Sequence, residues 1–533
     1  MIGTRTLSKT LRGAVALIAL LAWTAHGDPL AIDSGQISGA ISEADPSVRV
    51  YRGIPYAAPP VGDLRWKAPQ PAAPWDGVRA CERFGPVCPQ KDLSAILGIA
   101  LPETSEDCLY LNVWTPAEAP AGKLPVMLWI HGGANAFGWG SQPVYDGEPF
   151  VKKGVILITF NFRIGPFGFM AHPLLSEESE HKVSGNYGIL DQIAALQWIQ
   201  RNVAAFGGDP DNVTIFGQSA GGINVSALCL SPLAKGLFHR AIMSSGPFIW
   251  DTPHLKGNGA PGESFESWGE RYAKALLGEN TPVTLAALRS LPAEQLVAGV
   301  LEKMDSSPIA DGYVLPGYPA RLYAQGKQHP VPLLAGANKD EGSLFMLAAQ
   351  YKSVDDYRAG IRERWGDHTD TVFALYPAEA PKDFIKAVPA FLTDTRALAP
   401  TRATAIATVK AGAKAYLYQY THVQASSRLK GFGAHHSAEL PFLFNHFNIP
   451  GVPPGAPDEA DLRLADAMLT YWTQFAKTGD PNGNGLPEWP AYDPARDEHL
   501  ELGAEIRVQS GLRKTYCDAL DAIQGKITAA IAP

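Results

Sequence analysis

The sequence predicts an α/β fold in which a large, mostly parallel sheet is covered by helices on both faces. From residue 123 onward, short apolar runs alternate with segments of helical periodicity, and parallel strands joined by helices are covered on both sides. Residues 250–330 and 340–410 are mixed insertions between the apolar runs, and such insertions roof the pocket at the carboxyl ends of the strands. We find no Pro/Ser linker, charge run or internal repeat, so residues 28–533 are expected to form one domain.

Residues 1–27 have the features of a secretory signal peptide. Three basic side chains precede residue 13, and the ten-residue apolar run Ala14–Trp23 follows them. Ala25 and Gly27 then supply small residues at the two positions that determine cleavage. The apolar run is about half the ~20 residues that a membrane span requires. The sequence therefore predicts export, to the periplasm or the exterior, rather than a membrane anchor.

The composition excludes several classes of function. With 533 residues, 46% of them hydrophobic and 18% charged, the chain can bury a large core. A net charge of −8 argues against nucleic acid as a partner, and no other stretch is apolar enough for stable membrane insertion. The five cysteines show no Cys-x-x-Cys spacing, so no structural zinc is expected. Their odd number leaves at least one unpaired even in an oxidising compartment.

The elements follow in order along the chain. Residues 28–115 are rich in Pro and Gly with short strand-like runs, and they predict an N-terminal antiparallel sheet. The predicted buried strands are Val126–Ile130, Val155–Thr159, Val213–Phe216, Ala241–Ser244, Val331–Ala335 and Ala415–Tyr420. Apolar residues at helical spacing predict helices at 189–202 and 462–475. The second of these should end near Gly479, because a cation and then a glycine follow the last periodic residue.

A candidate nucleophile lies between the predicted strand Val213–Phe216 and a helix expected from Ala220 onward. Ser219 stands there in Gly-Gln-Ser-Ala-Gly, between Gly217 and Gly221. This is the pattern of a nucleophile elbow, a strained strand-to-helix turn that exposes a serine hydroxyl. Glycines are needed on both sides because side chains would collide where strand and helix cross. An ordinary Gly-rich turn is the alternative, so the choice depends on whether a base and an acid that could serve Ser219 occur elsewhere in the sequence.

A serine nucleophile needs a base, and the base needs a third group that orients it. The acid should follow the serine in sequence and the histidine should follow the acid. Asp340 and Glu341 come directly after a predicted strand, and either could be the acid. His435 and His436 follow the strand that ends at Tyr420. Metal binding by the histidine pair is disfavoured, because adjacent histidines diverge and no third ligand clusters nearby.

The oxyanion formed on an attacked carbonyl needs backbone N–H donors that are already in place. The amide of Ala220, directly after the nucleophile, should supply one of them. Others should come from the small residues of His131-Gly-Gly-Ala134, which follow an early strand as this chemistry requires. A donor loop, an elbow, an acid and a histidine thus occur in the expected order.

With these residues in place, the chain closely resembles the type-B carboxylesterases, the α/β-hydrolase family that includes cholinesterases and bacterial para-nitrobenzyl-type esterases. The resemblance extends from about Tyr51 to Tyr492. It rests on a series of motifs in the family's order: Arg52-Gly-Ile-Pro-Tyr-Ala57, Pro59-Pro-Val-Gly62, Ser105-Glu-Asp-Cys-Leu-Tyr-Leu-Asn112, Gly185-Asn-Tyr-Gly188 and Phe475-Ala-Lys-Thr-Gly-Asp-Pro481. It implies an α/β-hydrolase fold and hydrolysis of carboxylic esters without a cofactor or a metal.

The resemblance also assigns roles to individual residues. It implies Ser219 as nucleophile, Glu341 rather than Asp340 as acid, and His436 as base, since the family's histidine lies three residues before the glutamate that is Glu439 here. The other implied assignments are the oxyanion amides of Gly133, Ala134 and Ala220, supporting roles for Gln218 and Ser245, a disulfide between Cys88 and Cys108, and structural ion pairs of Arg65 with Glu106 and Arg163 with Asp191.

Three departures from the family pattern bear on the substrate. Ala134 stands where many members have a third glycine, and Gln218 stands where cholinesterases have a glutamate. The segment from Cys88 to Cys108 contains no Trp, whereas cholinesterases place a choline-binding Trp there. The last two departures disfavour choline esters, because a quaternary ammonium binds through an aromatic face and nearby negative charge.

We therefore expect an exported serine esterase that acts on small neutral alkyl or aryl esters. A relative that cleaves amides, carbamates or lipids is the main alternative, because the same triad serves those reactions. A catalytically inactive adhesion protein is a remoter alternative, since such members usually lack part of the triad. The sequence does not indicate an oligomeric state.

Overall fold

The computed structural model describes most of the chain. The described residues are 29–247, 254–256, 264–299, 306–348, 351–427, 429–447, 456–483 and 485–530. The expected signal peptide at residues 1–27 lies outside them, as do parts of the expected pocket roof within 250–330 and 340–410.

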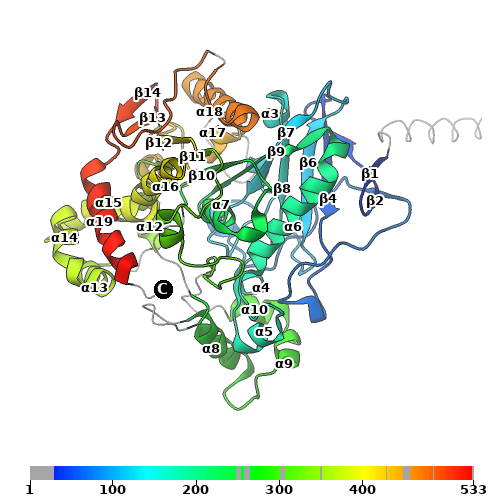
Figure 1. The fold of residues 1–533 in the computed structure, drawn as a ribbon, viewed down its shortest axis with the longest axis horizontal. Coiled ribbons are helices and arrows are strands. Elements are labelled where there is room, and N and C mark those ends of the chain that lie inside the picture. The colour runs from blue at the N-terminus through cyan, green and yellow to red at the C-terminus, as the bar shows by residue number, and fades with distance from the viewer. Residues whose placement is uncertain are drawn as a thin grey trace, which may run out of the picture.

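An eleven-stranded sheet forms the centre of the molecule (Figure 1), with the strand order β14-β13-β12-β11-β10-β9-β7-β8-β6-β4-β3. Every neighbouring pair from β8 to β13 is parallel, and the pairs at both ends are antiparallel. The strands are β3 (Ala40–Ile41), β4 (Val48–Pro55), β6 (Tyr110–Pro116), β7 (Leu124–Ile130), β8 (Ile156–Phe160), β9 (Gly208–Gln218), β10 (Arg240–Ser244), β11 (Leu333–Asn338), β12 (Ala415–Tyr420), β13 (Glu498–Leu502) and β14 (Ile506–Ser510).

The N-terminal region contains the expected antiparallel pairs, β1 (Leu30–Ile32) with β2 (Gly35–Ser38), β3 with β4 and β4 with β6. Strands β4 and β6 are antiparallel, but they extend the central sheet through β8. Their residues are buried on both faces, so they need helices or loops on both sides. Strands β1, β2 and β5 (Val78–Ala80) form a small separate sheet in which β2 and β5 are parallel.

The predicted parallel strands are confirmed, with ends that differ by a few residues. Strand β12 occupies the predicted range Ala415–Tyr420. Strand β9 is longer than predicted, because Asp209, Pro210 and Asp211 extend it although they are poor strand formers. Its pairing with β7 begins at Leu124 and Gly208, so a neighbouring strand holds these residues extended against their local preference.

Helices cover both faces of the sheet (Figure 1). They are α2 (Ser94–Leu97), α3 (Glu148–Lys152), α4 (Gly165–Phe169), α5 (Pro173–Glu178), α6 (Tyr187–Asn202), α7 (Ala220–Leu230), α8 (Phe265–Leu277), α9 (Leu285–Arg289), α10 (Ala293–Ala298), α11 (Pro319–Ala324), α12 (Glu341–Ala348), α13 (Val354–Trp365), α14 (Thr369–Leu375), α15 (Pro381–Thr393), α16 (Ala399–Lys410), α17 (Leu440–Leu443), α18 (Glu459–Thr478) and α19 (Lys514–Ala530). A π-helical turn, Asp394–Leu398, joins α15 to α16.

Alternating side chains of the strands feed two cores. In β7, Val126 and Leu128 pack with Ile193 of α6 and Val225 of α7. Met127 and Trp129 of the same strand belong to the opposite core, where α18 lies. Helix α18 begins at an Asp458 cap and ends at Gly479 in the left-handed conformation, which confirms the predicted stop.

Both expected structural ion pairs are present. Arg65 Nε donates to Glu106 Oε2 at 2.7 Å. Arg163 donates to both carboxylate oxygens of the fully buried Asp191, at 2.7 and 2.8 Å. Within the described part of the chain, no helix is both long and apolar enough to cross a membrane.

The disulfide expected between Cys88 and Cys108 is not formed, and all five cysteines are free thiols. The two side chains are nevertheless neighbours: the pKa of the Cys108 thiol is well above its usual value because it hydrogen-bonds to Cys88 and because it is buried. Cys88 Sγ in turn accepts from the Ile164 amide at 3.5 Å.

Candidate active site

Ser219 occupies a strained turn between β9 and α7. Its backbone has φ 56° and ψ −127°, a conformation that non-glycine residues rarely adopt. Its amide donates to the Ser244 carbonyl of β10 at 2.9 Å. Backbone strain of this kind persists where the surrounding structure enforces it, and such positions cluster at active sites. The side chain remains partly exposed at the carboxyl end of the sheet.

The glycines beside Ser219 are required by close backbone approach. A Cβ on Gly221 would lie 1.9 Å from the Ile130 carbonyl oxygen, and a Cβ on Gly217 would lie 2.5 Å from the Gly221 carbonyl carbon. Real Cβ atoms do not approach backbone so closely. The crossing of β9, α7 and the end of β7 therefore tolerates only glycine at these two positions.

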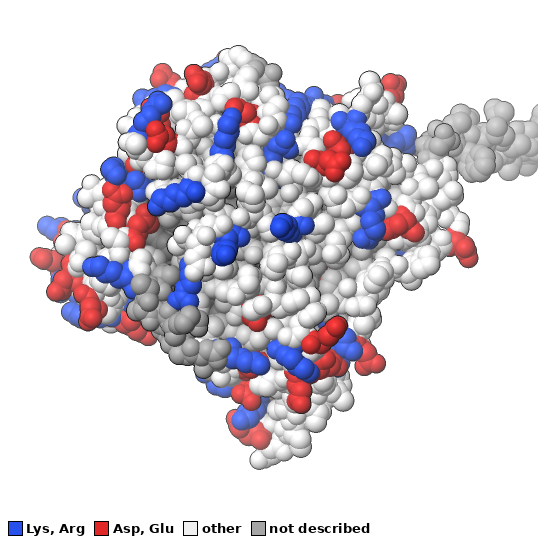
Figure 2. All heavy atoms as spheres, in the orientation of Figure 1, with Lys and Arg blue, Asp and Glu red and all other residues white. Residues whose placement is uncertain are grey.

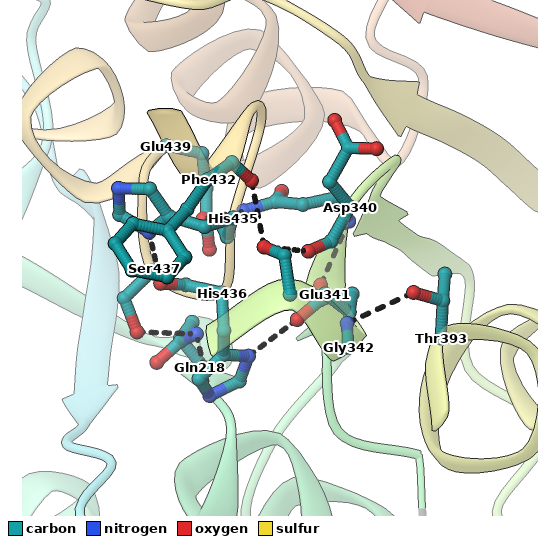
Figure 3. Close-up of polar contacts among 12 residues, drawn as sticks. Gln218, Asp340, Glu341, Gly342, Thr393, Phe432, His435, His436, Ser437 and Glu439 are labelled. Atoms are coloured by element: carbon teal, nitrogen blue, oxygen red, sulfur yellow. Dashed lines mark hydrogen bonds and ion pairs between the residues drawn. The ribbon is translucent and has the colours of Figure 1, made fainter. Parts of the chain in front are cut away.

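His436 and Glu341 form a buried pair (Figure 3). His436 Nδ1 lies 2.5 Å from Glu341 Oε2. Glu341 opens α12 directly after β11 and is fully buried, and its other carboxylate oxygen accepts from the Asn338 amide at 2.8 Å. A carboxylate bound to Nδ1 fixes the ring orientation and leaves Nε2 as the acceptor of a proton.

Asp340 and His435, the alternative acid and base, do not take part in this pair. The Asp340 carboxylate accepts from the Ala434 amide at 2.9 Å and does not contact a histidine among the described residues. His435 Nδ1 lies 2.8 Å from the His436 carbonyl oxygen, and Asn338 Nδ2 donates to the His435 carbonyl at 2.7 Å. Asp340 and His435 thus fasten the turn after β11 to the loop that carries His436 (Figure 3).

Charge at this pair favours the protonated imidazole. Burial lowers the pKa of His436, but the charge and the hydrogen bond of Glu341 outweigh it, so the net pKa is raised. Glu439 is a second buried carboxyl nearby, and Asn338 Nδ2 donates to it at 2.5 Å. Burial and repulsion from Glu341 raise the pKa of Glu439 to about 7. A protonated His436 ring is therefore stabilised by two acidic groups, Glu341 and Glu439.

Ser219 and His436, the candidate nucleophile and base, are not hydrogen-bonded to each other in the described residues. His436 Nε2 faces the amide of Gln218, whose Nε2 lies 3.4 Å away and also donates to Ser437 Oγ at 3.0 Å (Figure 3). Gln218 directly precedes Ser219, so the base is held next to the nucleophile's own backbone. Catalytic hydrogen bonds are often long or misaligned before substrate binds.

The loop after β7 lies against the nucleophile. A Cβ on Gly132 would lie 3.2 Å from Ser219 Cβ. Gly133 has φ 107°, and a Cβ there would lie 1.9 Å from the Phe137 carbonyl oxygen, so only glycine fits. Ala134 also has a positive φ, of 54°. The amides of Gly133, Ala134 and Ala220 donate to no other described residue, which leaves them available to a substrate oxygen.

A buried amide pair holds this loop on α7, and sequence reasoning missed it. Asn135 Nδ2 donates to Asn224 Oδ1 at 3.1 Å, and Asn224 Nδ2 donates to Asn135 Oδ1 at 2.8 Å. Both side chains are buried. The available signal was two asparagines close to the donor loop and the elbow, but 89 residues separate them.

Two further residues near the base were also missed. The Phe345 ring of α12 packs on the His436 ring with 4.5 Å between centroids. The Arg396 guanidinium, on the π-helical turn, lies 5.6 Å from the Phe345 ring centroid. Its positive charge opposes protonation of His436. Neither residue lies in a motif, so only the fold brings them to the site.

Ser245 lies directly after β10 with φ 53°, and its amide donates to the Gly336 carbonyl of β11 at 2.8 Å. Its hydroxyl is buried and has no partner among the described residues. The contact with β11 places Ser245 beside the strand that leads to Glu341. Nowhere in the described ranges do three or more His, Cys, Asp or Glu residues form a group that could hold a metal ion.

The similarity to known proteins extends along nearly the whole chain. A model described as the carboxylesterase family matches residues 28–520. The chain is 36% identical over 480 residues to the fumonisin B1 esterase of Sphingopyxis macrogoltabida, covering 89% of this chain and 87% of that protein. It is 36% identical over 494 residues to the para-nitrobenzyl esterase of Bacillus subtilis (strain 168), covering 89% and 95%. A solved thermophilic PNB esterase has a TM-score of 0.81 at 34% identity, with 92% and 99% covered.

Proposed function

Because this chain belongs to the carboxylesterase family, has the α/β-hydrolase fold and is a carboxylic ester hydrolase, we propose that it acts through Ser219, His436 and Glu341. The observation that carries the proposal is the contact of His436 Nδ1 with Glu341 Oε2 beside the strained turn of Ser219. That contact is the arrangement that an acyl-transfer base requires.

In the proposed reaction, Ser219 Oγ attacks the ester carbonyl carbon while its proton passes to His436 Nε2. The amide of Gln218 now faces this nitrogen, so it must give way as the serine proton approaches. The carbonyl oxygen becomes an oxyanion and accepts from the amides of Gly133, Ala134 and Ala220. Collapse of the tetrahedral intermediate breaks the ester C–O bond, and His436 returns the proton to the leaving alcohol.

Water then attacks the acyl-enzyme, with His436 again as base, and the carboxylic acid leaves. Removing the triad from serine hydrolases typically lowers kcat by on the order of 10⁴–10⁶. A single oxyanion donor contributes roughly 10²–10³. The triad therefore dominates the expected rate enhancement, and the three amides follow.

We propose further that neutral alkyl or aryl esters are preferred over choline esters. Three features support this. Gln218 places an amide rather than a carboxylate next to the nucleophile, the Cys88–Cys108 segment has no Trp, and the Arg396 guanidinium already lies against the ring of Phe345. A cation–π contact contributes about 2 kcal/mol when desolvated, and its loss corresponds to roughly thirtyfold in kcat/KM.

Export through residues 1–27 remains part of the proposal, because the basic, apolar and small-residue order of that segment is typical of a cleaved signal. N-terminal sequencing of the mature protein from a secreting host tests it, and a retained Met1 would contradict cleavage.

The nucleophile is tested with a fluorophosphonate. The reagent should abolish turnover and label the peptide that contains Ser219, and the Ser219→Ala variant should lose at least about 10³ in kcat and remain unlabelled. The exposed Ser290, which hydrogen-bonds only to a helix carbonyl, provides the control variant Ser290→Ala with unchanged labelling. Stoichiometric labelling of another serine, or an active Ser219→Ala enzyme, would refute the assignment.

The alcohol preference is tested with pairs of esters that share one acyl group. One alcohol is choline and the other its neutral carbon isostere, so that leaving-group reactivity is matched. We expect kcat/KM to favour the neutral ester by at least about tenfold. Faster hydrolysis of the choline ester would show that the chain has a cation site that these residues do not reveal. Fumonisin B1 belongs in the same panel, because a relative is named for its hydrolysis.

A further inference from the structure

A second cavity lies close to the triad but contains none of its residues. It has a volume of about 480 Å³ and lies at the edge of the sheet formed by β12, β13 and β14, against α15 and the π-helical turn. These elements gather at one end of the molecule (Figure 1). The lining residues that matter for its chemistry are Lys339, Lys386, Thr393, His499, Glu501 and Arg513.

Three carboxylates line this cavity: Asp394 and Glu501 are paired with arginines, and Asp340 accepts from the Ala434 amide at 2.9 Å. Asp394 is fully buried and accepts from Arg513 Nε at 3.0 Å and from the Tyr376 hydroxyl at 2.7 Å. Glu501 accepts from Arg507 Nε at 2.8 Å and from Gln509 at 2.9 Å. Arg513 is therefore committed to Asp394, and neither Asp394 nor Glu501 presents unpaired negative charge to the cavity.

Two cations and an imidazole also line the cavity, and their side chains form no ion pair and no hydrogen bond with other described residues. Lys339 and Lys386 are exposed and form no ion pair within the described residues. His499 is only 4% exposed, and its buried Nδ1 has no hydrogen-bond partner in the described part of the chain. A buried polar group without a partner is unfavourable, and a ligand that hydrogen-bonds to it relieves that cost. The cavity thus offers two positive charges at its rim and a hydrogen-bonding ring within.

The general distribution of charge on the molecular surface does not account for the two unpaired lysines at this cavity. Over the face in Figure 2, basic and acidic side chains are interspersed and no large area carries a single sign. Two unpaired lysines that share a cavity with an unpartnered histidine are a local arrangement. Lysine binds carboxylate and phosphate oxygens as a point charge.

We propose that this cavity binds a small anion that carries carboxylate or phosphate groups, and that the bound anion changes the rate of ester hydrolysis. The anionic oxygens pair with Lys339 and Lys386, and His499 forms a hydrogen bond with a further oxygen of the ligand.

The route to the triad is short. Lys339 lies two residues before Glu341, and its amide donates to the Tyr420 carbonyl at 2.9 Å. Thr393, another lining residue, accepts from the Gly342 amide at 2.8 Å. Ser343, which also lines the cavity, donates at 2.6 Å to the carbonyl of Phe432, in the loop that carries His436. An anion in the cavity therefore contacts residues that hold both the acid and the base.

Binding is measured first by calorimetry on enzyme whose active serine has been blocked with a fluorophosphonate, so that the active site cannot bind the anion. Citrate and inorganic phosphate are titrated separately at ionic strength fixed with sodium chloride. This arm does not depend on which residues form the triad. We expect one saturable site with a Kd below about 10 mM for at least one of the two anions.

The test variant is Lys339→Gln/Lys386→Gln, and the matched control is Lys382→Gln. Lys382 is an exposed lysine on α15, the helix that also carries Lys386, and it lies outside the cavity. The Kd should rise at least about tenfold in the double variant and stay unchanged in the control. Binding of citrate alone identifies carboxylate as the recognised group, and binding of phosphate alone identifies phosphate.

The effect of the anion on kcat is measured with enzyme whose active serine has not been blocked. Saturating anion should change kcat about twofold or more in the wild type and in Lys382→Gln, but not in the double variant. Absence of saturable binding by both anions, or equal binding to the double variant when its thermal unfolding is unchanged, would overturn the site. Binding without any change in kcat would overturn the effector role.

Discussion

Replacing Asn224 with alanine separates positioning of the oxyanion loop from stability of the fold. Asn224 lies in α7, where alanine is the most favourable residue, so the substitution leaves the helix backbone undisturbed. Asn135, its partner, has φ 51°, and alanine there would add backbone strain of its own. Asn224→Ala therefore removes the amide pair without adding backbone strain.

The expected magnitude follows from what the substitution leaves behind. Asn135 is 2% exposed and loses partners for both its donor and its acceptor. Leaving such groups unsatisfied destabilises a fold by about 1–3 kcal/mol. Loss of one whole oxyanion donor lowers kcat by roughly 10²–10³. The Asn135 carbonyl still accepts from the Gly165 amide at 2.6 Å, so the loop is displaced rather than released. We expect a decrease in kcat of about 10- to 100-fold.

The assay is steady-state hydrolysis of a small neutral aryl ester, with active enzyme counted by fluorophosphonate titration and stability measured by denaturant unfolding. Asn202→Ala is the matched control. Asn202 is equally buried, accepts from the Asp33 amide at 2.8 Å and donates to the Trp198 carbonyl at 3.0 Å, but contacts no site residue. It should lose similar stability and keep kcat within about threefold. Wild-type kcat in folded Asn224→Ala would refute the reasoning.

The remaining predictions concern the base. His436→Ala should lower kcat by at least about 10³ and His435→Ala by less than about tenfold, because only His436 contacts Glu341. The kcat values of the two purified variants test this prediction. If His435→Ala lost more activity than His436→Ala, the two roles would be exchanged. The acid limb of the kcat/KM profile should have its midpoint above about 6.5, because the base must be unprotonated and its folded pKa is raised; activity is lost as pH falls through that value. Glu439→Gln should lower the midpoint, since the Glu439 charge raises the pKa of His436, and an unchanged or higher midpoint would contradict this account.

The parts of the site that could be predicted are those in which local sequence and strand order carry the information. Ser219 follows a buried strand and lies between two glycines that the backbone crossing requires. Glu341 follows β11 by a few residues. Parallel strands bring their carboxyl ends to one edge of the sheet, so residues that follow such strands meet there regardless of their separation in sequence.

The parts that could not be predicted depend on side-chain geometry between distant segments. Periodicity does not show that Asn135 and Asn224 exchange two hydrogen bonds. The choice between Asp340 and Glu341 depends on which neighbouring carboxylate turns toward His436, and bottom-up reasoning left both open. A disulfide was expected between Cys88 and Cys108, and both are free thiols, because chain position does not determine whether two neighbouring thiols are oxidised.

The unusual backbone of Ser219 sets stability against activity. A non-glycine residue in such a conformation destabilises the native state by about 1–3 kcal/mol, and the fold tolerates this because β9, β10 and α7 enforce the turn. A glycine at the same position would relieve the strain and remove the hydroxyl that we propose as the nucleophile. Selection for stability without selection for activity would therefore favour an inactive chain. Improving the thermal tolerance of this enzyme requires changes away from the elbow.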